Sequence, residues 1–121
     1  TSSQNESEYC LLHNIDLGAE VGLTKEQIAL IQTEDFEEAE CLDERTKAAI
    51  AWVDAVTGLT ASEDDAAFQR IKSHFNEQQI VELTVLCCMW NFSNRFTEAF
   101  HIPPEPPEKR LRFRPLPAEA E

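Results

Sequence analysis

The sequence predicts an all-α fold, a bundle of about five helices followed by an irregular, proline-rich C-terminal tail. Residues that cap helix N-termini recur along the chain, and each is followed by apolar residues at helical spacing. All six prolines fall between Pro103 and Pro117, so no proline interrupts the helices before them. A chain of 121 residues fits a single domain. We therefore expect a helical domain at residues 1–102 and a tail at residues 103–121.

The first two helices are predicted from paired capping residues. Asn5 and Glu8 have the spacing of a capping box, and the apolar residues after them predict a helix to about Gly22. Glycine adopts the left-handed conformation that commonly ends a helix. A second box, Thr-x-x-Gln at residues 24–27, predicts a short helix to about Gln32.

The middle of the chain is predicted to hold an acidic loop and a third helix. The acidic stretch 33–42 contains a single aromatic residue, and we interpret it as a solvated loop or a frayed turn. Asp43 then has the position of an N-cap for a helix that ends at Gly58. The broad apolar face of this helix includes Trp52, which we assign to the core, although it could also line a substrate pocket.

The longest predicted helix runs from about 77 to 100. Before it, residues 62–65 cap a fourth helix to about Phe75, and Asn76 with Gln79 then forms a capping box for the long helix. Apolar residues lie nearly all round the long helix: Ile80, Leu83, Val85, Leu86, Met89, Trp90, Phe92, Phe96 and Phe100. Such a helix needs more cover than a domain this small supplies. The sequence therefore predicts a homo-oligomer in which a partner subunit covers one face.

Charge and composition exclude several classes of partner. The formal net charge is −13, and residues 1–102 hold 19 acidic against 6 basic side chains. Such an acidic body repels nucleic acid and anionic membranes, so we expect neither as a partner. No apolar run reaches the ~20 residues of a membrane span, and no signal-peptide pattern opens the chain.

The cysteines indicate the cellular compartment and argue against a metal site. They stand at positions 10, 41, 87 and 88, an irregular set that fits a reducing cytoplasm better than a secreted protein. The Cys and His spacings complete no zinc-binding array, so we expect no metal and no cofactor. Adjacent Cys87 and Cys88 are interpreted as small buried apolar residues.

The candidate functional site lies in residues 7–13, Ser-Glu-Tyr-Cys-Leu-Leu-His. On a helix Ser7, Cys10 and His13 fall along one stripe, because each is three residues from the next. Cys10 would lie in the first turns, where the positive end of the helix dipole favours a thiolate. His13 would be close enough to pass a proton to or from the sulfur. We therefore predict a reactive site formed by these three side chains.

Further motifs accompany this run along the chain. They are Gly18, residues 21–28, residues 75–83 and residues 91–96, the last of which holds an Asn-Arg pair. Together with residues 7–13 they resemble the carboxymuconolactone decarboxylase family, and within it the alkylhydroperoxidase D-like branch, over roughly residues 5–104. The resemblance implies an alkylhydroperoxidase D-like helical bundle, a trimer or hexamer, and a thiol peroxidase or disulfide reductase.

The sequence departs from that family at two places. The branch carries Cys-x-x-Cys, and Ser7 stands where the first cysteine would be. A hydroxyl cannot close a disulfide, so the resolving thiol would have to come from Cys41, from an external thiol reductant or from a partner protein. The family also has a glutamate upstream of the motif. It has no counterpart that we can identify, since only six residues precede Ser7, and this abrupt start would fit a missing upstream segment.

Three classes of function remain open. In the first, which the resemblance implies, Cys10 attacks a small-molecule peroxide and His13 shuttles the proton. In the second, a cofactor-free decarboxylase or isomerase acts on a small carboxylate, with His13 as general acid or base and Cys10 lining the pocket. In the third, a non-catalytic relative keeps the oligomeric scaffold, with or without a bound small molecule. We prefer the first, because Cys10 and His13 lie one turn apart.

The tail combines prolines with a basic cluster. Four of the ten basic residues stand within six positions, at Lys109, Arg110, Arg112 and Arg114. We interpret the tail as a strap over the acidic body of its own or a neighbouring subunit, because opposite charges attract within the same chain. A proline-rich ligand for another domain and a mobile tail are the alternatives.

Overall fold

The computed structural model describes residues 1–110, so that Arg112 and Arg114 of the predicted strap lie outside the described residues. Within the described part the chain is all-helical and has no strand, which confirms the predicted fold class. It contains five α-helices and two short 3₁₀ helices. These are α1 Glu8–Glu20, α2 Lys25–Ile31, η1 Glu34–Glu38, α3 Glu44–Thr57, α4 Asp65–Lys72, α5 Glu77–Ala99 and η2 Pro107–Lys109.

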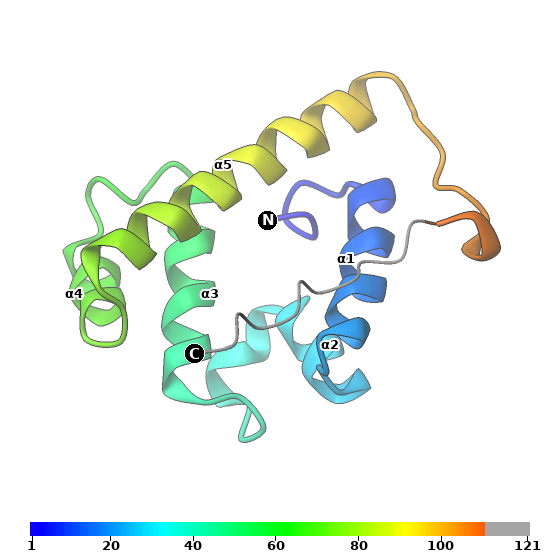
Figure 1. Ribbon diagram of the computed structural model, residues 1–121. Helices are drawn as coiled ribbons and strands as arrows, with labels where there is room; N and C mark the ends of the chain where they lie inside the picture. Colours follow the sequence, from blue (N-terminus) through cyan, green and yellow to red (C-terminus); the bar gives the residue numbers. More distant parts are fainter. Residues whose placement is uncertain (111–121) are drawn as a thin grey trace, which may run out of the picture.

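The long helix α5 runs along one side of the molecule and joins two groups of helices (Figure 1). Helices α3 and α4 pack against each other and against its N-terminal half, and α1 packs against its C-terminal half. Helix α2 contacts both α1 and η1. After α5 the chain turns back and descends beside α1, which brings residues 103–110 next to the N-terminal helix (Figure 1).

The apolar core lies between α3, α4 and α5. It consists of the buried residues Trp52, Ala67, Ile71 and Ile80, with partly buried apolar neighbours packed around them. Trp52 Nε1 donates a hydrogen bond to Thr84 Oγ1 at 2.9 Å, which satisfies the buried indole. Trp52 is therefore a core residue, as the sequence predicted.

Four of the predicted helix starts agree with the structure. Within the predicted residues 62–65, Asp64 caps α4 by accepting from Ala67 N at 2.9 Å. Thr24 and Asn76 each form a full capping box with the glutamine three residues later. Asp43 caps α3 by accepting from Thr46 N at 2.7 Å. Gly22 has a φ of +98°, the left-handed conformation expected at the end of the first helix, although α1 itself ends at Glu20.

The predicted capping box at Asn5 and Glu8 is wrong. The N-cap of α1 is Ser7, whose hydroxyl accepts from Cys10 N, and the helix begins only at Glu8. The amide of Asn5 instead donates to Asn91 Oδ1 and Asn94 Oδ1, at 2.9 and 3.0 Å. Sequence spacing alone could not reveal that α5 would supply better partners for Asn5 than its own helix.

The acidic stretch 33–42 is not the solvated loop that we expected. It contains η1, and its apolar residues Phe36, Ala39 and Leu42 are buried in a second cluster against α2 and α3. Phe36 lies in η1, Ala39 is its C-cap and Leu42 follows it; the three apolar side chains, three positions apart, turn inward while acidic residues such as Glu37 stay exposed. The spacing of three was the signal that the charge run concealed.

Two further expectations about helices are corrected. Helix α4 ends at Lys72 rather than near Phe75, because Ser73 already has the C-cap position. Of the adjacent cysteines, Cys87 is buried but Cys88 is exposed. Neighbouring residues on a helix point about 100° apart, so one of the two faces the core and the other faces outward.

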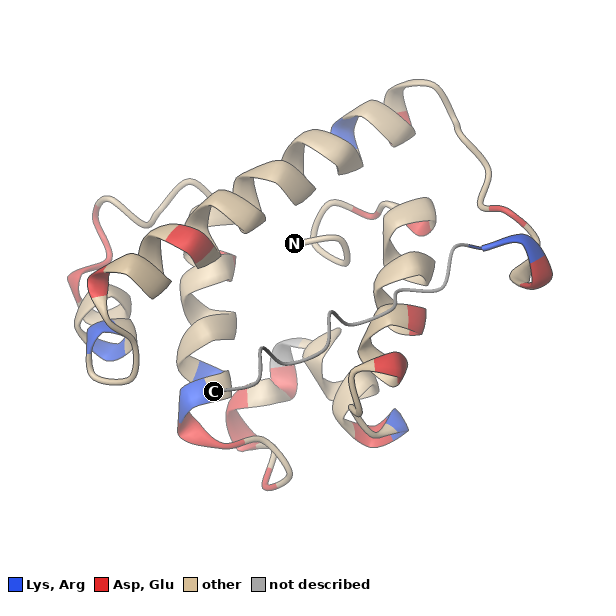
Figure 2. Cartoon of the chain, in the orientation of Figure 1, with Lys and Arg blue, Asp and Glu red and all other residues tan. Residues whose placement is uncertain are grey.

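Helix α5 has an exposed apolar face. Six apolar residues along it are each more than half exposed: Val81, Val85, Leu86, Met89, Phe92 and Phe96. Figure 2 shows that α5 carries few charged residues along its length, whereas acidic residues are frequent on the other helices and loops. The structure therefore presents a long uncharged surface on an otherwise acidic molecule.

Candidate functional site

The Cys10 sulfur lies in a polar cluster between α1 and α5. It is 3.3 Å from Ser93 Oγ and 3.7 Å from Thr97 Oγ1, and the residue is 1% exposed. Ser7, the N-cap of α1, is also fully buried, and its hydroxyl lies 3.1 Å from that of Thr97. Hydroxyl groups rather than hydrocarbon therefore surround the sulfur on its α5 side.

Ser93 is the hydroxyl best able to donate a hydrogen bond to a Cys10 thiolate. Thr97 Oγ1 lies within hydrogen-bonding distance of the α5 carbonyl groups of Ser93 and Asn94, at 3.0 and 3.1 Å, and these can only accept. The Thr97 hydroxyl is thus largely committed to its own helix. Ser93 keeps its proton available for the sulfur.

This environment changes the acidity of the thiol. Burial raises the pKa of Cys10, but hydrogen bonds from Ser93, Ser7, Asn94 and Thr97 outweigh burial and hold that pKa below the usual value of a free cysteine. The position of Cys10 near the start of α1 acts in the same direction, because unpaired backbone N–H groups face the helix N-terminus. The cluster therefore favours the thiolate.

His13 occupies a separate cluster on the neighbouring face of α1. Its Nδ1 lies 2.8 Å from the carbonyl oxygen of Tyr9, and its Nε2 lies 3.1 Å from Glu105 Oε2. The ring also stacks on Tyr9, with 4.4 Å between the ring centroids. Because a carbonyl only accepts, Nδ1 carries a proton, and the contact of Nε2 with a carboxylate is attractive only when Nε2 carries one as well.

Glu105 is brought to His13 by the chain that follows α5. Its second carboxylate oxygen, Oε1, accepts a hydrogen bond from the Tyr9 hydroxyl at 3.0 Å. Arg110 anchors this segment, since its guanidinium donates to Asp16 Oδ2 and to the Glu105 carbonyl, both at 2.9 Å. The described part of the predicted strap therefore lies on the acidic helix α1 of its own subunit.

Charge couples the two clusters through Tyr9. Burial raises the pKa of the Tyr9 phenol, and the hydrogen bond to Glu105 and the negative charges of Glu105 and Cys10 raise it further. Hydrogen bonds from its own backbone N–H and from the Tyr9 hydroxyl lower the pKa of the Glu105 carboxyl, and His13 lowers it further. Tyr9 is therefore a neutral donor between two groups that favour negative charge.

The structure brings together only part of the predicted site. Ser7 and Cys10 belong to one cluster, as expected, although Ser7 is the N-cap rather than a residue of the helix. The Cys10 sulfur lies closest to the hydroxyls of Ser93 and Thr97, with Ser7 and Asn94 also lowering its pKa, whereas His13 contacts Tyr9 and Glu105. The three-residue spacing placed the two side chains on adjacent faces, about 60° apart around α1, and the tertiary contacts then drew them to different partners.

Sequence reasoning missed most of the residues that surround Cys10 and His13. Ser93 and Thr97 had a recognisable signal, because two hydroxyl residues four apart in an otherwise apolar helix suggest a polar stripe. The sequence signal for Glu105 was weaker: it is an acidic residue between two Pro-Pro pairs. Nothing in the sequence joined either of them to residues 9–13.

A network of amide and hydroxyl groups lies behind the Cys10 cluster. Asn94 is fully buried in α5, accepts from Asn5 and donates to Ser2 Oγ at 3.2 Å. Asn14 of α1 donates to the same Ser2 oxygen at 3.1 Å. The N-terminal residues thus bridge α1 and α5 through side-chain hydrogen bonds, and Asn94 connects this bridge to the thiol.

The described residues give no indication of a metal site. Across residues 1–110, no three His, Cys, Asp or Glu side chains are grouped so that they could hold a metal ion. The four cysteines are free thiols. Over the same residues, each helix is too short or too polar to cross a membrane.

Comparison with known proteins connects the chain to others of undetermined function. No protein-family model matches it. The chain is 31% identical over 85 residues to the uncharacterized protein YnjA of Escherichia coli K12, a match that covers 67% of the chain and 47% of YnjA. The matched region thus spans about half the length of this curated relative.

The structure is similar to a crystal structure from Agrobacterium tumefaciens. That protein is described as of unknown function and as a candidate antioxidant defence protein AhpD. The TM-score is 0.79 at 28% sequence identity, with 86% of this chain and 70% of the other covered. The chain therefore has the alkylhydroperoxidase D-like helical fold that the sequence predicted.

Proposed function

We propose that the protein is a thiol-dependent peroxidase in which Cys10 is the reacting residue. The observation that supports this most strongly is the cluster of hydroxyl groups around a buried thiol whose pKa is lowered. A peroxide is small and needs a hydrogen-bond donor for the oxygen that leaves, and the Ser93 hydroxyl can turn from the sulfur to that oxygen once the S–O bond forms. The similarity to a candidate antioxidant defence protein agrees with this proposal.

The proposed reaction has two steps. The Cys10 thiolate attacks one oxygen of the peroxide, so an S–O bond forms while the O–O bond breaks. Cys10 becomes a sulfenic acid, and the second oxygen leaves as an alcohol or water after it takes up a proton. Two molecules of an external thiol then reduce the sulfenic acid, which yields their disulfide, water and the Cys10 thiol.

His13 is the proposed proton shuttle. Glu105 holds the imidazole and favours a proton on Nε2, which can be delivered to the departing oxygen. His13 does not touch the sulfur, so this transfer requires the peroxide or a water molecule between them. Ser7 caps the helix and orients the hydroxyl of Thr97, and this is a positioning role.

Selective oxidation of Cys10 tests the proposal. Reduced protein is treated with hydrogen peroxide in the presence of a sulfenic-acid trap, and each thiol is followed by mass spectrometry. Cys10 should be trapped first, although it is 1% exposed. Cys87 is a matched control, because it is buried and lies 3.4 Å from the hydroxyls of Thr1 and Thr57 but outside the proposed site.

An alkylating reagent should modify the thiols in a different order from peroxide. Iodoacetamide should modify the exposed Cys88 before Cys10, because alkylation of a thiol follows its access to solvent as well as its acidity. If peroxide followed the alkylation order, or modified Cys10 and Cys87 equally, Cys10 would be an ordinary buried thiol.

A second candidate function is favoured by one observation. The His13 and Glu105 side chains are 24% and 44% exposed, so this pair is more accessible than the sulfur, although the Glu105 Oε2 that faces His13 is itself buried. Such a pair suits a general acid or base acting on a small carboxylate. Under this alternative His13→Ala removes turnover and Cys10→Ser leaves it largely intact, whereas under the peroxidase proposal Cys10→Ser removes it.

We further propose that the protein is a homo-oligomer, a trimer or hexamer, formed through the exposed apolar face of α5. A second copy of the chain is the favoured occupant, because this face is uncharged and two acidic chains repel one another elsewhere. Light scattering on Phe92→Glu should then give a smaller mass than on the unmodified chain. Val21→Glu, at an apolar residue that is 56% exposed and follows α1, is the control and should leave the mass unchanged.

A further inference from the structure

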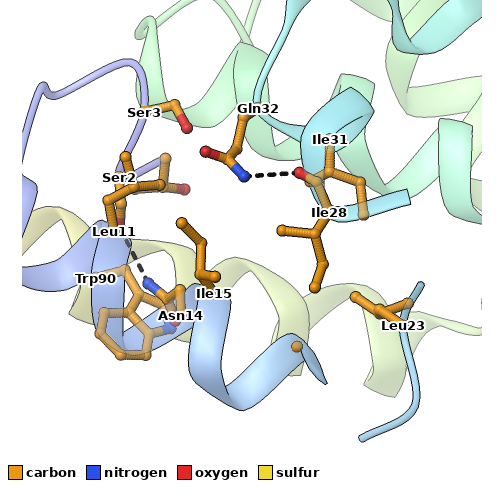
Figure 3. Close-up of a pocket in the computed structure, with 12 residues that line it drawn as sticks. Ser2, Ser3, Leu11, Asn14, Ile15, Leu23, Ile28, Ile31, Gln32 and Trp90 are labelled. Carbon is orange, nitrogen blue, oxygen red and sulfur yellow. Dashed lines mark hydrogen bonds between the residues drawn. The ribbon is translucent and has the colours of Figure 1, made fainter. Parts of the chain in front are cut away.

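A cavity lies on the side of α1 away from Glu105. Its volume is about 240 Å³, and it is bounded by α1, α2, Trp90 of α5 and the N-terminal residues (Figure 3). Leu11, Ile15, Ile28 and Ile31 provide apolar walls. The volume corresponds to that of about eight water molecules, which is enough for a compact organic molecule.

The side chains that line this cavity carry no charge. None of its twelve lining residues is Asp, Glu, Lys, Arg or His, although the chain as a whole has 23 acidic residues. An ion would therefore meet no oppositely charged side chain there, and an anion would also meet the repulsion of the acidic body. The cavity thus selects against charged ligands.

Polar groups gather at one part of the cavity. The Gln32 amide nitrogen donates to the Ile28 carbonyl at 2.8 Å, and Figure 3 shows the Gln32 oxygen on the side that faces Ser3. The nitrogen of Asn14 is engaged with Ser2, so its own carbonyl oxygen is the atom left to accept. The polar part of the cavity therefore offers acceptors next to apolar walls.

We propose that this cavity binds a small neutral amphiphile, a molecule with a short apolar body and one hydroxyl or similar hydrogen-bond donor. The apolar body would lie against Ile15, Ile28 and Trp90, and the donor would reach the Gln32 oxygen. This proposal is separate from the peroxidase proposal, because the Cys10 sulfur does not line the cavity.

The geometry of α1 is consistent with a site that must stay open. A Cβ placed on Gly18 would lie 3.3 Å from Leu23 Cδ1 and 3.5 Å from Ile28 Cγ1. Gly18 therefore permits the close approach of α1 to the segment 23–28, and a side chain there would occupy space at the edge of the cavity.

Binding is tested with three probes of similar size. They are n-octanol, methyl heptyl ether, which has no donor, and octanoate, which is charged. Titrations are followed by calorimetry and by the fluorescence of Trp90 in a Trp52→Phe variant, because Trp52 and Trp90 are the two tryptophans of the chain. We expect saturable binding of n-octanol, about fivefold weaker binding of the ether from the loss of one hydrogen bond, and no binding of octanoate.

Substitutions locate the ligand. Ile15→Phe should abolish n-octanol binding by filling the cavity, and Gly18→Ala should weaken it if the first variant fails to fold. Gln32→Met should make n-octanol and the ether bind equally. Cys10→Ser should bind n-octanol like the unmodified chain, so failure of the thiol chemistry and failure of this site are distinguishable.

Two outcomes would overturn the proposal. The first is the absence of saturable n-octanol binding, or octanoate binding as tight as that of n-octanol. The second is loss of binding in Val85→Asp together with its retention in Ile15→Phe, because the probe would then lie on the apolar face of α5 instead.

Discussion

The two halves of α5 are packed by opposite kinds of contact. Near its N-terminal half Ile71 of α4 is fully buried among apolar side chains, with Trp52 and Ile80 beside it. Near its C-terminal half Asn94 is equally buried, but its neighbours are the amide and hydroxyl groups of Asn5 and Ser2. The same helix thus contributes to an apolar core at one end and to a polar core at the other.

This difference shows why the candidate chemistry lies at one end only. Apolar contacts are non-directional, so they stabilise the fold without fixing the charge state of any group. Hydrogen bonds are directional and act on one protonation state more than the other. The polar end of α5 therefore tunes Cys10, whereas the apolar end holds α3 and α4 together.

Ile71→Ala should have the largest effect on stability. It removes a fully buried side chain from the apolar core and leaves a cavity, so we expect the free energy of unfolding to fall by about 2–5 kcal/mol. Urea unfolding followed by circular dichroism measures the change. The pKa of Cys10, measured on the folded variant by thiolate absorbance, should not move, and a shift would mean that the two ends of α5 are not independent.

Asn94→Leu should cost less stability and yet change the thiol. It leaves the groups that bond to Asn94 without a buried partner, a loss of about 1–3 kcal/mol in the free energy of unfolding. The pKa of Cys10 should rise, because the Asn94 side chain is one of the groups that lower it. An unchanged thiol titration would show that Asn94 is structural only.

The pH dependence of stability isolates the contribution of Cys10. Its pKa is lower in the folded protein than in the unfolded chain, so between these two values the unfolded state binds more protons. The free energy of unfolding should therefore gain from this group as pH rises through that window and lose the gain as pH falls through the folded pKa.

Two variants identify that contribution by unfolding at several pH values under reducing conditions. Cys10→Ser should make the free energy of unfolding depend less on pH. Ser93→Ala should raise the folded pKa of Cys10, because the Ser93 hydrogen bond is the first of those that lower it. The pH range over which stability rises should then become narrower. If both variants showed the same pH dependence of stability as the unmodified chain, Cys10 would not be its cause.

The surface arginines should give the smallest effects. Arg70 pairs with Glu37 and Glu44 near the apolar end, and Arg110 pairs with Asp16 near the polar end. Replacing either with Ala should cost no more than about 1 kcal/mol, because exposed pairs are screened by solvent. Only Arg110→Ala should alter the imidazole NMR signals of His13, since Arg110 anchors the segment that carries Glu105. If the His13 signals were the same in both variants, Glu105 would not depend on Arg110 for its position.

Local signals predicted much of the fold. The capping boxes at Thr24 and Asn76 depend on residues three positions apart, and α5 is apolar enough to be recognised from its own sequence. The failures occurred where distant residues intervened. Asn5 bonded to α5 instead of capping α1, and Phe36 was buried by α2 and α3 despite its acidic neighbours.

The candidate site was predicted only in part for the same reason. The sequence placed Ser7, Cys10 and His13 near one another because they share a helix. It gave no sign that Ser93 would approach the sulfur or that Glu105 would approach the imidazole, since 83 residues separate the members of the first pair.

By itself, then, the sequence determined the helical class and most helix boundaries and singled out a candidate thiol, because each depends on residues within a few positions of one another. Only the tertiary structure decided which hydroxyls surround that thiol, which carboxylate holds His13, and which face of α5 remains bare. Those outcomes depend on how helices distant in sequence meet, and hydrogen bonds over such distances form only after packing has fixed the positions of both partners.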